Sequence, residues 1–398
     1  MMGLATTWSV AVKALAIVVA LPGLVGALHL GFMAIASWFY WPVERRRQRS
    51  GSALPAPRFA VVIPAHNEES VIGATLQAIC DDMDPSDLLI VVADRCTDAT
   101  ASIARSFGAV VLERYPGEEP GRAAARNAGI RFALEHEWDG ILMIDADSVI
   151  DSGFFPAVRR AFGDRPPALQ ARSEAALGTK LMDQASIASF AIQGITLPRG
   201  RGALGLMVRL RGTGMVVRRD MVERFSFRAP ASEDLWFSLD MCLEGFVPRH
   251  VDGVRLRSES VGNLADATIQ RTRYEAGRMS AAKEFVPRLI RARTAASLEA
   301  AWFLVSPPFA VCAGSLALGL AVSLLSPGTI SYLISAGLFL LAVALVTGLL
   351  QARASLRTWL ALAAAPWYVG WKMILQVRAL RTVAKGVEEF GATPRNPR

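Results

Sequence analysis

Apolar and polar positions follow two different rhythms along residues 58–147. Short apolar runs, such as the one in RFAVVIPAHN at 58–67, have the length and composition of buried strands. Between them, segments such as GRAAARNAGIRFALEH at 121–136 repeat their apolar residues with helical spacing. This alternation predicts an α/β fold built on a parallel sheet with helices on both faces. The expected strands are 58–67, 87–94, 109–114 and 140–147, and the expected helices are 68–79, 98–108 and 121–136.

Two much longer apolar stretches flank this region. Residues 14–35 contain a single ionisable side chain, His29, and residues 300–350 contain no charged side chain. Because a membrane helix needs roughly 20 apolar residues, the first stretch predicts one membrane span. The second predicts a hairpin of two spans that turns at the Ser-Pro-Gly sequence of 326–328.

A shorter apolar stretch lies at 359–371 and is followed by Lys372, Arg378 and Arg381. Its basic and aromatic character predicts a helix that lies in the membrane interface. The alternative is a fourth span that extends to Val377. A fourth span would place the two arginines outside the cell, against the usual distribution of positive charge.

Lys and Arg are unevenly distributed around the first apolar stretch. Arg45, Arg46, Arg47 and Arg49 follow it, whereas one Lys precedes it. Positive loops stay cytoplasmic, so we expect residues 41–299 to face the cytoplasm, in a multi-pass protein of a bacterial inner membrane. A cleaved signal peptide is the alternative, but the stretch is long and lacks a good small-residue cleavage site.

The composition agrees with membrane attachment. The chain has 398 residues, of which 52% are hydrophobic, and its formal net charge is +8. The mean hydropathy of +0.33 is high for a soluble protein. On a membrane protein, a basic excess is typical of loops that lie beside anionic lipid, so membrane lipids are expected partners.

Several functional classes lack their sequence signatures here. The chain has no helix-turn-helix, zinc-finger or RNA-binding signature, so we expect no nucleic-acid partner. It has no GxGxxG after the first predicted strand and no GxxxxGK[ST], which argues against a dinucleotide enzyme and a P-loop ATPase. The four cysteines are scattered without metal-binding spacing, and a cytoplasmic domain would keep them reduced.

The apolar run at 141–144 ends abruptly in Asp145-Ala146-Asp147. Two carboxylates one residue apart cannot stay buried without a partner, so we expect them at the carboxyl end of the strand, where open parallel sheets bind ligands. Asp94 ends another predicted strand and is expected in the same crevice. A divalent cation, Mg²⁺ or Mn²⁺, would join such carboxylates to a diphosphate. The alternative is a solvated turn.

Six motifs in this order resemble the family 2 glycosyltransferases of the GT-A fold, especially the membrane-bound, polysaccharide synthase-type members. The resemblance runs from about residue 58 to 280. It implies a doubly wound, mixed GT-A sheet with α-helical membrane segments, and inverting transfer of a hexose from a UDP-sugar. The motifs are VVIPAHNEE (61–69), VVADRCTDAT (91–100), IDADS (144–148), RGTGMVVRRD (211–220), SEDLWFSLDM (232–241) and QRTRY (270–274).

The resemblance also implies roles for individual residues. Asp234 would be the general base, with Glu233 beside it in the motif, and Asp147 would ligate the metal, with Asp145 next to it. The residues implied in binding the donor nucleotide are Pro64, Ala65, Asn67, Glu68, Asp94, Arg122 and Asp145. The residues implied near the acceptor and the diphosphate are Gly212, Gln270, Arg271, Arg273 and Tyr274.

These roles agree with the chemistry of sugar transfer. An acceptor hydroxyl is a poor nucleophile, and a carboxylate within hydrogen-bond reach can take its proton. A metal ion and guanidinium groups stabilise the charge of the departing UDP. Several of the motifs also have a structural alternative. Ser232, Glu233 and Asp234 could cap a helix, the arginines at 271, 273 and 278 could face lipid, and Trp236 and Phe237 could be core residues.

Two departures from the family pattern bear on the acceptor. Tyr274 stands where a Trp is usual, and the lysine expected near 121–129 is replaced by Arg122 or Arg126. The smaller aromatic residue and the few spans do not favour processive extension. The expected acceptor is a growing glycan or a lipid-linked sugar in exopolysaccharide or cell-envelope synthesis. The alternatives are a glycolipid synthase acting on ceramide, diacylglycerol or hopanoid, and a non-catalytic subunit that binds nucleotide sugar.

The expected organisation has six parts, and an export or synthase partner subunit would be needed for a long polymer channel. The parts are an N-terminal transmembrane helix (1–40), a basic cytoplasmic linker (41–57), a GT-A domain (58–262), interfacial amphipathic helices (263–299), a transmembrane hairpin (300–350), and an interfacial helix with a cytoplasmic tail (351–398).

Overall fold

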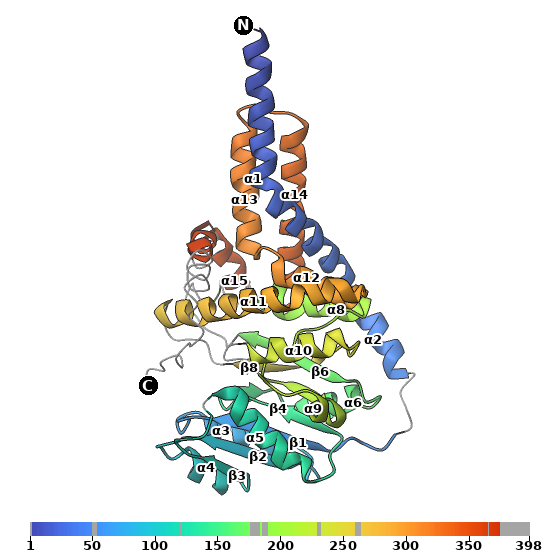
Figure 1. Ribbon diagram of the computed structural model, residues 1–398, viewed down its shortest axis with the longest axis vertical. Helices are drawn as coiled ribbons and strands as arrows, with labels where there is room; N and C mark the ends of the chain where they lie inside the picture. Colours follow the sequence, from blue (N-terminus) through green and yellow to red (C-terminus); the bar gives the residue numbers. More distant parts are fainter. Residues whose placement is uncertain are drawn as a thin grey trace.

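Eight strands form one sheet in the order β3-β2-β1-β4-β7-β6-β8-β5 (Figure 1). The computed structural model describes residues 2–49, 54–119, 121–175, 184, 190–228, 232–258, 264–364 and 366–374. Strands β1 to β4 are parallel, whereas β7 is antiparallel to both β4 and β6, so the sheet is mixed. The predicted α/β sheet is therefore confirmed. The strands are β1 (Phe59–Ala65), β2 (Leu88–Asp94), β3 (Val110–Arg114), β4 (Gly140–Met143), β5 (Ser148–Ile150), β6 (Ala168–Ala175), β7 (Met215–Arg218) and β8 (Arg249–Ser258).

Helices cover both faces of the sheet because successive side chains of a strand point to opposite faces. In β1, Phe59, Val61 and Ile63 join one fully buried cluster, and Ala60 and Val62 join the other. Helices α3 (Ile72–Cys80), α4 (Thr100–Ser106) and α6 (Phe154–Ala161) pack on the first face. Helices α5 (Arg122–Leu134), α9 (Arg219–Arg224) and α10 (Glu233–Leu243) pack on the second.

Two neighbouring strands at the centre of the sheet, β1 and β4, end at different heights, which is the position where the sequence predicts the ligand crevice. The last β1–β4 pair is Val62 with Met143, and β1 continues to Ala65. Sequence periodicity placed the end of the fourth strand at residue 147, but β4 ends at Met143 and the chain turns before β5. The acidic motif therefore lies in a turn and not in the strand itself.

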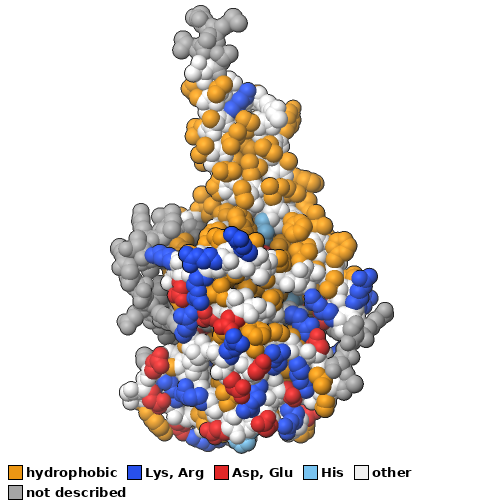
Figure 2. All heavy atoms as spheres, turned by 45° about the vertical axis from the view of Figure 1, so that its right-hand side comes forward, with side chains coloured by type: hydrophobic (Ala, Val, Ile, Leu, Met, Phe, Trp, Pro, Cys, Tyr) orange, Lys and Arg blue, Asp and Glu red, His pale blue; other side chains and the backbone are white. Residues whose placement is uncertain are grey.

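Three apolar helices form a column on the opposite side of the molecule from the sheet (Figure 1). They are α1 (Met2–Ser37), α13 (Phe309–Ser323) and α14 (Thr329–Gln351), and the predicted turn at 326–328 separates the last two. Hydrophobic side chains cover the surface of the column, whereas charged side chains cover the α/β part (Figure 2). Two helices, Thr7–Ser37 and Thr329–Gln351, are long and apolar enough to cross a membrane.

The first arm of the hairpin differs from its prediction. Residues 300–350 contain no charge, but the helix breaks at 306–308, and α12 (Ala295–Val305) meets α13 at a bend of 67°. The break follows from Pro307 and Pro308, because proline lacks a backbone N–H and disfavours helical geometry in the residue before it. Helix α13 has 15 residues and is therefore about 22 Å long, which is short for a span unless α12 is counted with it.

Three helices, α8 (Leu197–Leu204), α11 (Leu264–Ala292) and α12, lie across the molecule between the column and the sheet (Figure 1). The basic linker after the first apolar helix begins as a helix, α2 (Tyr40–Arg49). The segment predicted to lie in the interface contains α15 (Leu356–Leu360), the 3-10 turn η2 (Ala361–Ala364) and helical residues 366–374. The alternative of a fourth span ends at Val377, which lies outside the described residues.

Arg278 illustrates how these transverse helices hold the column. Its guanidinium in α11 donates to the backbone carbonyls of Phe303, Leu304 and Ser306, at 3.2, 3.2 and 2.8 Å. The last carbonyls of a helix have no partner within the helix, and a cation there also complements the helix dipole. Arg278 therefore secures the end of α12 and does not form a face toward lipid.

Candidate active site

The acidic motif occupies a tight turn between β4 and β5. The backbone N–H of Ser148 donates to the carbonyl of Asp145 at 3.0 Å, and the N–H of Asp145 donates to Oγ1 of Thr213 at 3.0 Å. Thr75 of α3 donates its hydroxyl to the carbonyl of Ala146 at 2.8 Å. Asp145 and Asp147 are both partly exposed. The turn is fixed by its own backbone and by two other elements, and it presents its carboxylates to the crevice.

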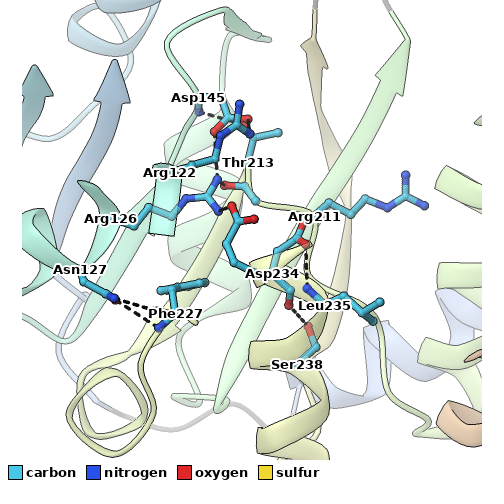
Figure 3. Close-up of polar contacts among 12 residues, drawn as sticks. Arg122, Arg126, Asn127, Asp145, Arg211, Thr213, Phe227, Asp234, Leu235 and Ser238 are labelled. Carbon is cyan, nitrogen blue, oxygen red and sulfur yellow. Dashed lines mark hydrogen bonds and ion pairs between the residues drawn. The ribbon is translucent and has the colours of Figure 1, made fainter. Parts of the chain in front are cut away.

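Arg126 of α5 is the central charge of the site (Figure 3). Its side chain is fully buried, and it bonds to the carboxylates of Asp145 at 3.1 Å and Glu233 at 2.5 Å. It also donates to the backbone carbonyl of Gly212 at 2.8 Å. Three of the quoted motifs, separated by up to about ninety residues, thus meet at one guanidinium. Sequence reasoning named Arg126 only as one of two replacements for a missing lysine, because burial of an arginine leaves no sequence signal.

Arg122, the donor-site residue expected from the sequence, lies one helical turn earlier in α5. It contacts the other oxygen of the Asp145 carboxylate at 3.0 Å, and its side chain is 46% exposed. Asp145, followed by weaker contributions that include Glu233 and Asp147, raises the pKa of the Arg122 guanidinium above its usual value. Two arginines therefore hold Asp145, and the exposed one is accessible to a ligand.

The loop that contains Gly212 is tightly constrained. Gly212 has a φ of +80°, and a Cβ atom there would lie 2.7 Å from Nη2 of Arg126 and 3.4 Å from Oδ2 of Asp234. Any side chain would therefore collide with the site. The buried side chain of Gln170 in β6 accepts from the N–H of Arg211 at 2.8 Å and donates to the carbonyl of Thr213 at 2.9 Å. Gln170 positions this loop, and no sequence motif marks it.

Asp234 lies in the first turn of α10, a position that the helix-cap alternative also requires. Its Oδ1 accepts from the N–H of Leu235 at 2.7 Å, and its backbone carbonyl accepts from the hydroxyl of Ser238 at 2.7 Å (Figure 3). Ser232 has a left-handed backbone with φ of +60° and makes no side-chain cap. The helix-cap alternative therefore lacks its capping bond from Ser232.

The environment of Asp234 favours a proton acceptor. Burial, followed by the negative charge of Glu233, raises the pKa of Asp234, whereas Arg209 and Arg126 oppose this rise. The helix N-terminus alone would favour the ionised carboxylate. A carboxylate whose pKa is raised is a stronger base, so burial improves its match to proton abstraction near neutral pH.

The motif at 270–274 lies in α11, beside the crevice. Tyr274 is 47% exposed. Partial loss of solvent around its hydroxyl raises the pKa of Tyr274, while Arg122 opposes this rise and Asp234 reinforces it. The tyrosine therefore lies within electrostatic reach of both the Asp145 side and the Asp234 side of the site. Arg273 is half-buried next to it, and the side chains of Gln270 and Arg271 lie outside the described residues.

The loop after β1 is tied to the loop after β2. The side-chain oxygen of Asn67 accepts from the N–H of Thr97 at 2.8 Å, and the N–H of Glu68 donates to Oγ1 of Thr100 at 2.8 Å. Pro64 and Ala65 form the end of β1 beyond its pairing with β4. Asn67 and Glu68 thus shape the loop through the bonds they make, and the roles implied for these four residues in donor binding stay predictions.

Asp94 ends β2 and is held by two arginines. Oδ1 of Asp94 accepts from Arg114 of β3 at 2.9 Å, and Oδ2 accepts from Arg95 at 3.0 Å. Asp94 and Arg114 are 5% and 6% exposed. A carboxylate in this position is fixed in orientation at the strand end, as the sequence predicted. Its contact with a nucleotide base stays a prediction.

The two aromatic residues of α10 belong to the core, which was one of the alternatives from the sequence. Phe237 is fully buried and stacks on Phe227 with ring centres 4.3 Å apart. Trp236 meets Phe285 of α11 edge to face at 5.2 Å. Asn127 of α5 donates to the carbonyl of Phe227 at 2.8 Å and accepts from its N–H at 3.1 Å (Figure 3). These contacts fix α10 against α5.

The residues described above fall within a segment of the chain that matches a known protein family. A family model described as glycosyltransferase-like family 2 matches residues 56–277, which is more than half of the chain. The chain belongs to glycosyltransferase family 2. The resemblance that rested on six short motifs is thereby confirmed, and this family 2 glycosyltransferase contains its acidic motifs at Asp145, Asp147, Glu233 and Asp234 within the matched region.

Curated relatives are similar to this glycosyltransferase over short segments. A probable glycosyltransferase, YdaM, of Bacillus subtilis is 39% identical over 100 residues, which are 23% of this chain and 23% of the relative. The 4,4'-diaponeurosporenoate glycosyltransferase of Staphylococcus aureus is 38% identical over 90 residues, which are 22% of this chain and 23% of the relative. The similarity therefore spans less than a quarter of the length of either relative.

A solved structure supports the fold over a much larger part of this glycosyltransferase. A mannosyltransferase from Pyrobaculum calidifontis, in complex with GDP-Man and Mn²⁺, superposes with a TM-score of 0.50 at 17% identity. The superposition covers 86% of this chain and 98% of that chain. The GT-A fold expected from the motifs is thereby confirmed, and with it the mixed sheet that carries the site.

Proposed function

We propose that this enzyme transfers a hexose from a UDP-sugar to a hydroxyl group of a lipid or lipid-linked acceptor, with inversion at the anomeric carbon. The observation that carries the proposal is the guanidinium of Arg126. It holds Asp145, on the donor side of the crevice, and Glu233, the neighbour of the proposed base Asp234. The same contacts of Arg126 therefore position the residues proposed for donor binding and those proposed for proton abstraction.

The proposed reaction is a single displacement. Asp234 takes the proton of the acceptor hydroxyl as the hydroxyl oxygen forms its bond to the anomeric carbon. The bond from that carbon to the diphosphate breaks, and UDP leaves with the electron pair. Arg122 and Arg126 supply fixed positive charge on the side where the diphosphate gains charge. Because these charges are held in place before the reaction, the site needs little reorganisation to stabilise the transition state.

The acidic turn fits a divalent cation. In the described residues, no three His, Cys, Asp or Glu side chains form a complete metal cage. Mg²⁺ usually keeps several waters and binds through one or two carboxylates together with substrate phosphates, and Asp147 and Asp145 are two partly exposed carboxylates in one turn. When bound there, Mg²⁺ or Mn²⁺ would neutralise charge on the diphosphate.

Metal dependence gives the first prediction. Asp147→Asn should abolish turnover and leave the fold intact, because it removes one ligand charge from a partly exposed turn. Chelation of the wild type with EDTA should have the same effect, and Mn²⁺ or Mg²⁺ added in excess should restore UDP release. Asp81→Asn, which removes an equal charge from the exposed end of α3, is the control that keeps both carboxylates of the turn. Full activity in EDTA would exclude the metal.

The column of helices favours a lipid acceptor over a long polymer. The glycines of these helices allow the helices to contact one another directly. A Cβ atom at Gly23 of α1 would lie 2.5 Å from Oγ of Ser315 in α13, and one at Gly319 of α13 would lie 2.7 Å from Cβ of Ala20 in α1. One at Gly337 would lie 2.9 Å from a methyl group of Leu24. Helices α1, α13 and α14 therefore pack tightly on one another, and this packing supports a single addition to a membrane lipid, with the catalytic crevice at the membrane surface.

Membrane orientation gives the second prediction. The arginines of α2 follow the first apolar helix, and positive segments stay in the cytoplasm. A topology reporter inserted at Gly328 should therefore read periplasmic, and one fused after Arg398 should read cytoplasmic. A reporter inserted at Gly117, in a loop of the α/β part, is the cytoplasmic control. A cytoplasmic signal at Gly328 would reject the hairpin assignment.

Donor identity and catalysis can be tested together. Purified enzyme in detergent is given a panel of UDP-sugars and GDP-Man with lipid extract, and nucleotide release and product mass are measured. The proposal predicts release of UDP together with a lipid whose mass has increased by one hexose. Release of GDP alone would correct the donor. Nucleotide-sugar binding with no release and no product would support a non-catalytic subunit instead.

A further inference from the structure

Three arginines gather where the α/β part meets the helices of the column. The guanidinium carbons of Arg201 and Arg209 lie 5.2 and 5.5 Å from the centre of the same ring, that of Phe303 in α12. Arg211 donates to the backbone carbonyl of Gln193 in the π-helical turn η1 (Ala191–Thr196). The three cations therefore share a small volume bounded by α8, α12 and η1.

Only one of these cations has a carboxylate partner in the described part of the chain. Arg201 contacts Oε1 of Glu299 through two nitrogens at 2.9 and 2.8 Å. Arg209 makes no hydrogen bond or ion pair among the described residues, and Arg211 has a backbone carbonyl but no carboxylate. Both side chains are half-buried, and like charges held close together repel one another, so a bound anion would stabilise the pair.

The unpaired charge lies within electrostatic reach of the proposed base. Burial, followed by repulsion from Arg209 and Arg201, lowers the pKa of Arg211. Arg209 also opposes the burial that raises the pKa of Asp234. An anion bound between Arg209 and Arg211 would relieve their repulsion.

We propose that Arg209 and Arg211 bind the phosphate of an anionic membrane lipid and thereby present a hydroxyl of its headgroup to Asp234. This inference rests on the proposed function and specifies its acceptor as a lipid that carries a phosphodiester or diphosphate beside the accepting hydroxyl. Guanidinium groups suit this task because their planar fork holds two phosphate oxygens.

The surroundings favour a lipid as the source of the phosphate. Phe303 lies near the end of α12, which leads into α13, and η1 packs against α14 through the contact of Ala191 with Gly348. Both walls of the site therefore belong to the base of the apolar column. In the transfer step the lipid phosphate stays intact. The headgroup hydroxyl gives its proton to Asp234 and its oxygen to the new glycosidic bond.

Binding of short-chain lipids to the full-length protein in detergent tests the proposal. Native mass spectrometry would measure the affinity for dioctanoylphosphatidylglycerol, dioctanoylglycerol, glycerol 3-phosphate and inorganic phosphate. We expect the phosphate to tighten binding of the lipid by about tenfold over dioctanoylglycerol. Arg209→Gln should remove this preference, and Arg211→Gln should do the same if it folds. Arg105→Gln, which removes an equal charge from the exposed end of α4, should retain it.

The outcomes separate this proposal from the proposed function, because UDP binding is measured on the same samples. Equal affinity for the two lipids, or a phosphate preference that survives in Arg209→Gln, would overturn the lipid-phosphate site. Glycerol 3-phosphate or inorganic phosphate binding as tightly as the phospholipid would assign the site to a soluble ligand and overturn the lipid source. Loss of preference in Arg209→Gln in a protein that does not bind UDP would uphold the lipid site and reject the donor assignment.

Discussion

Asp234→Asn is expected to lower sugar transfer by about a hundredfold or more while leaving UDP affinity close to that of the wild type. Asparagine has nearly the same shape as aspartate and can still accept from the N–H of Leu235, a bond of 2.7 Å in the wild type. It cannot take a proton from the acceptor. The measurement is the transfer rate, the UDP affinity and the melting temperature of one purified variant.

Asp240→Asn is the matched control for this variant. Asp240 lies in the same helix, and its carboxylate pairs with Arg228 at 2.9 Å, away from the crevice. It should transfer sugar at the wild-type rate. If Asp234 only stabilised the helix start, its variant would lose about 1 kcal/mol of stability and keep transfer. Near-normal transfer by Asp234→Asn would therefore place the base elsewhere.

The pH dependence of the transfer rate is an independent test of Asp234 as the base. Asp234 must be ionised to accept a proton, and burial followed by Glu233 raises its pKa above the ordinary carboxyl value. The rate should therefore fall as the pH drops through a pKa that is higher than about 4. The residual activity of Asp234→Asn should lack this limb of the profile.

Arg126→Gln is expected to cost about 3 to 5 kcal/mol of stability and to abolish UDP binding. The wild-type guanidinium is fully buried and holds the carboxylates of Asp145 and Glu233. Glutamine would leave both carboxylates in a partly buried crevice without their cation, and the cost of an uncompensated charge exceeds the value of the pair itself. The melting temperature and UDP affinity of the purified variant measure these losses.

Two further variants show whether the loss of stability in Arg126→Gln arises from carboxylates that have lost their cation. Arg131→Gln removes an exposed arginine from the same helix and should leave both quantities unchanged. Glu233→Gln combined with Arg126→Gln removes one of the stranded carboxylates and should recover part of the stability lost in the single variant. A single variant as stable as the wild type, with normal UDP affinity, would show that Arg126 does not organise the site.

The sequence predicted the parallel half of the sheet because strand and helix periodicities are local properties. Apolar runs such as 87–94 and helical spacing such as 121–136 are decided by neighbouring residues. The antiparallel strands β6 and β7 were not predicted in detail, because their pairing joins residues about 50 apart. The break at Pro307 and Pro308 differs from the predicted hairpin because a stretch without charge can still contain residues that end a helix.

In the candidate site, too, features set by neighbouring residues could be predicted, whereas contacts between distant segments could not. The acidic turn, Glu233 and Asp234 could be found because each stands in a short motif. The contacts of Arg126 and Gln170 could not be predicted, since they depend on which segments the fold brings together. The proximity of Arg209 to Arg211 likewise becomes informative only when the structure shows that the carboxylate of Glu299 pairs with Arg201.

The length of α1 has a consequence for how the bilayer could influence catalysis. Its 36 residues extend about 54 Å, well beyond a hydrocarbon core of about 30 Å. Near its end, Met33 lies so close to α8 that a Cβ atom at Gly200 would be 2.7 Å from the carbonyl oxygen of Met33. Helix α8 continues directly into the segment that contains Arg209 and Gly212. A long apolar helix adapts to thinner or thicker membranes by tilting, and a tilt of α1 would reach the loop that contains Gly212 through this close contact. Acyl-chain length would then regulate the rate of transfer.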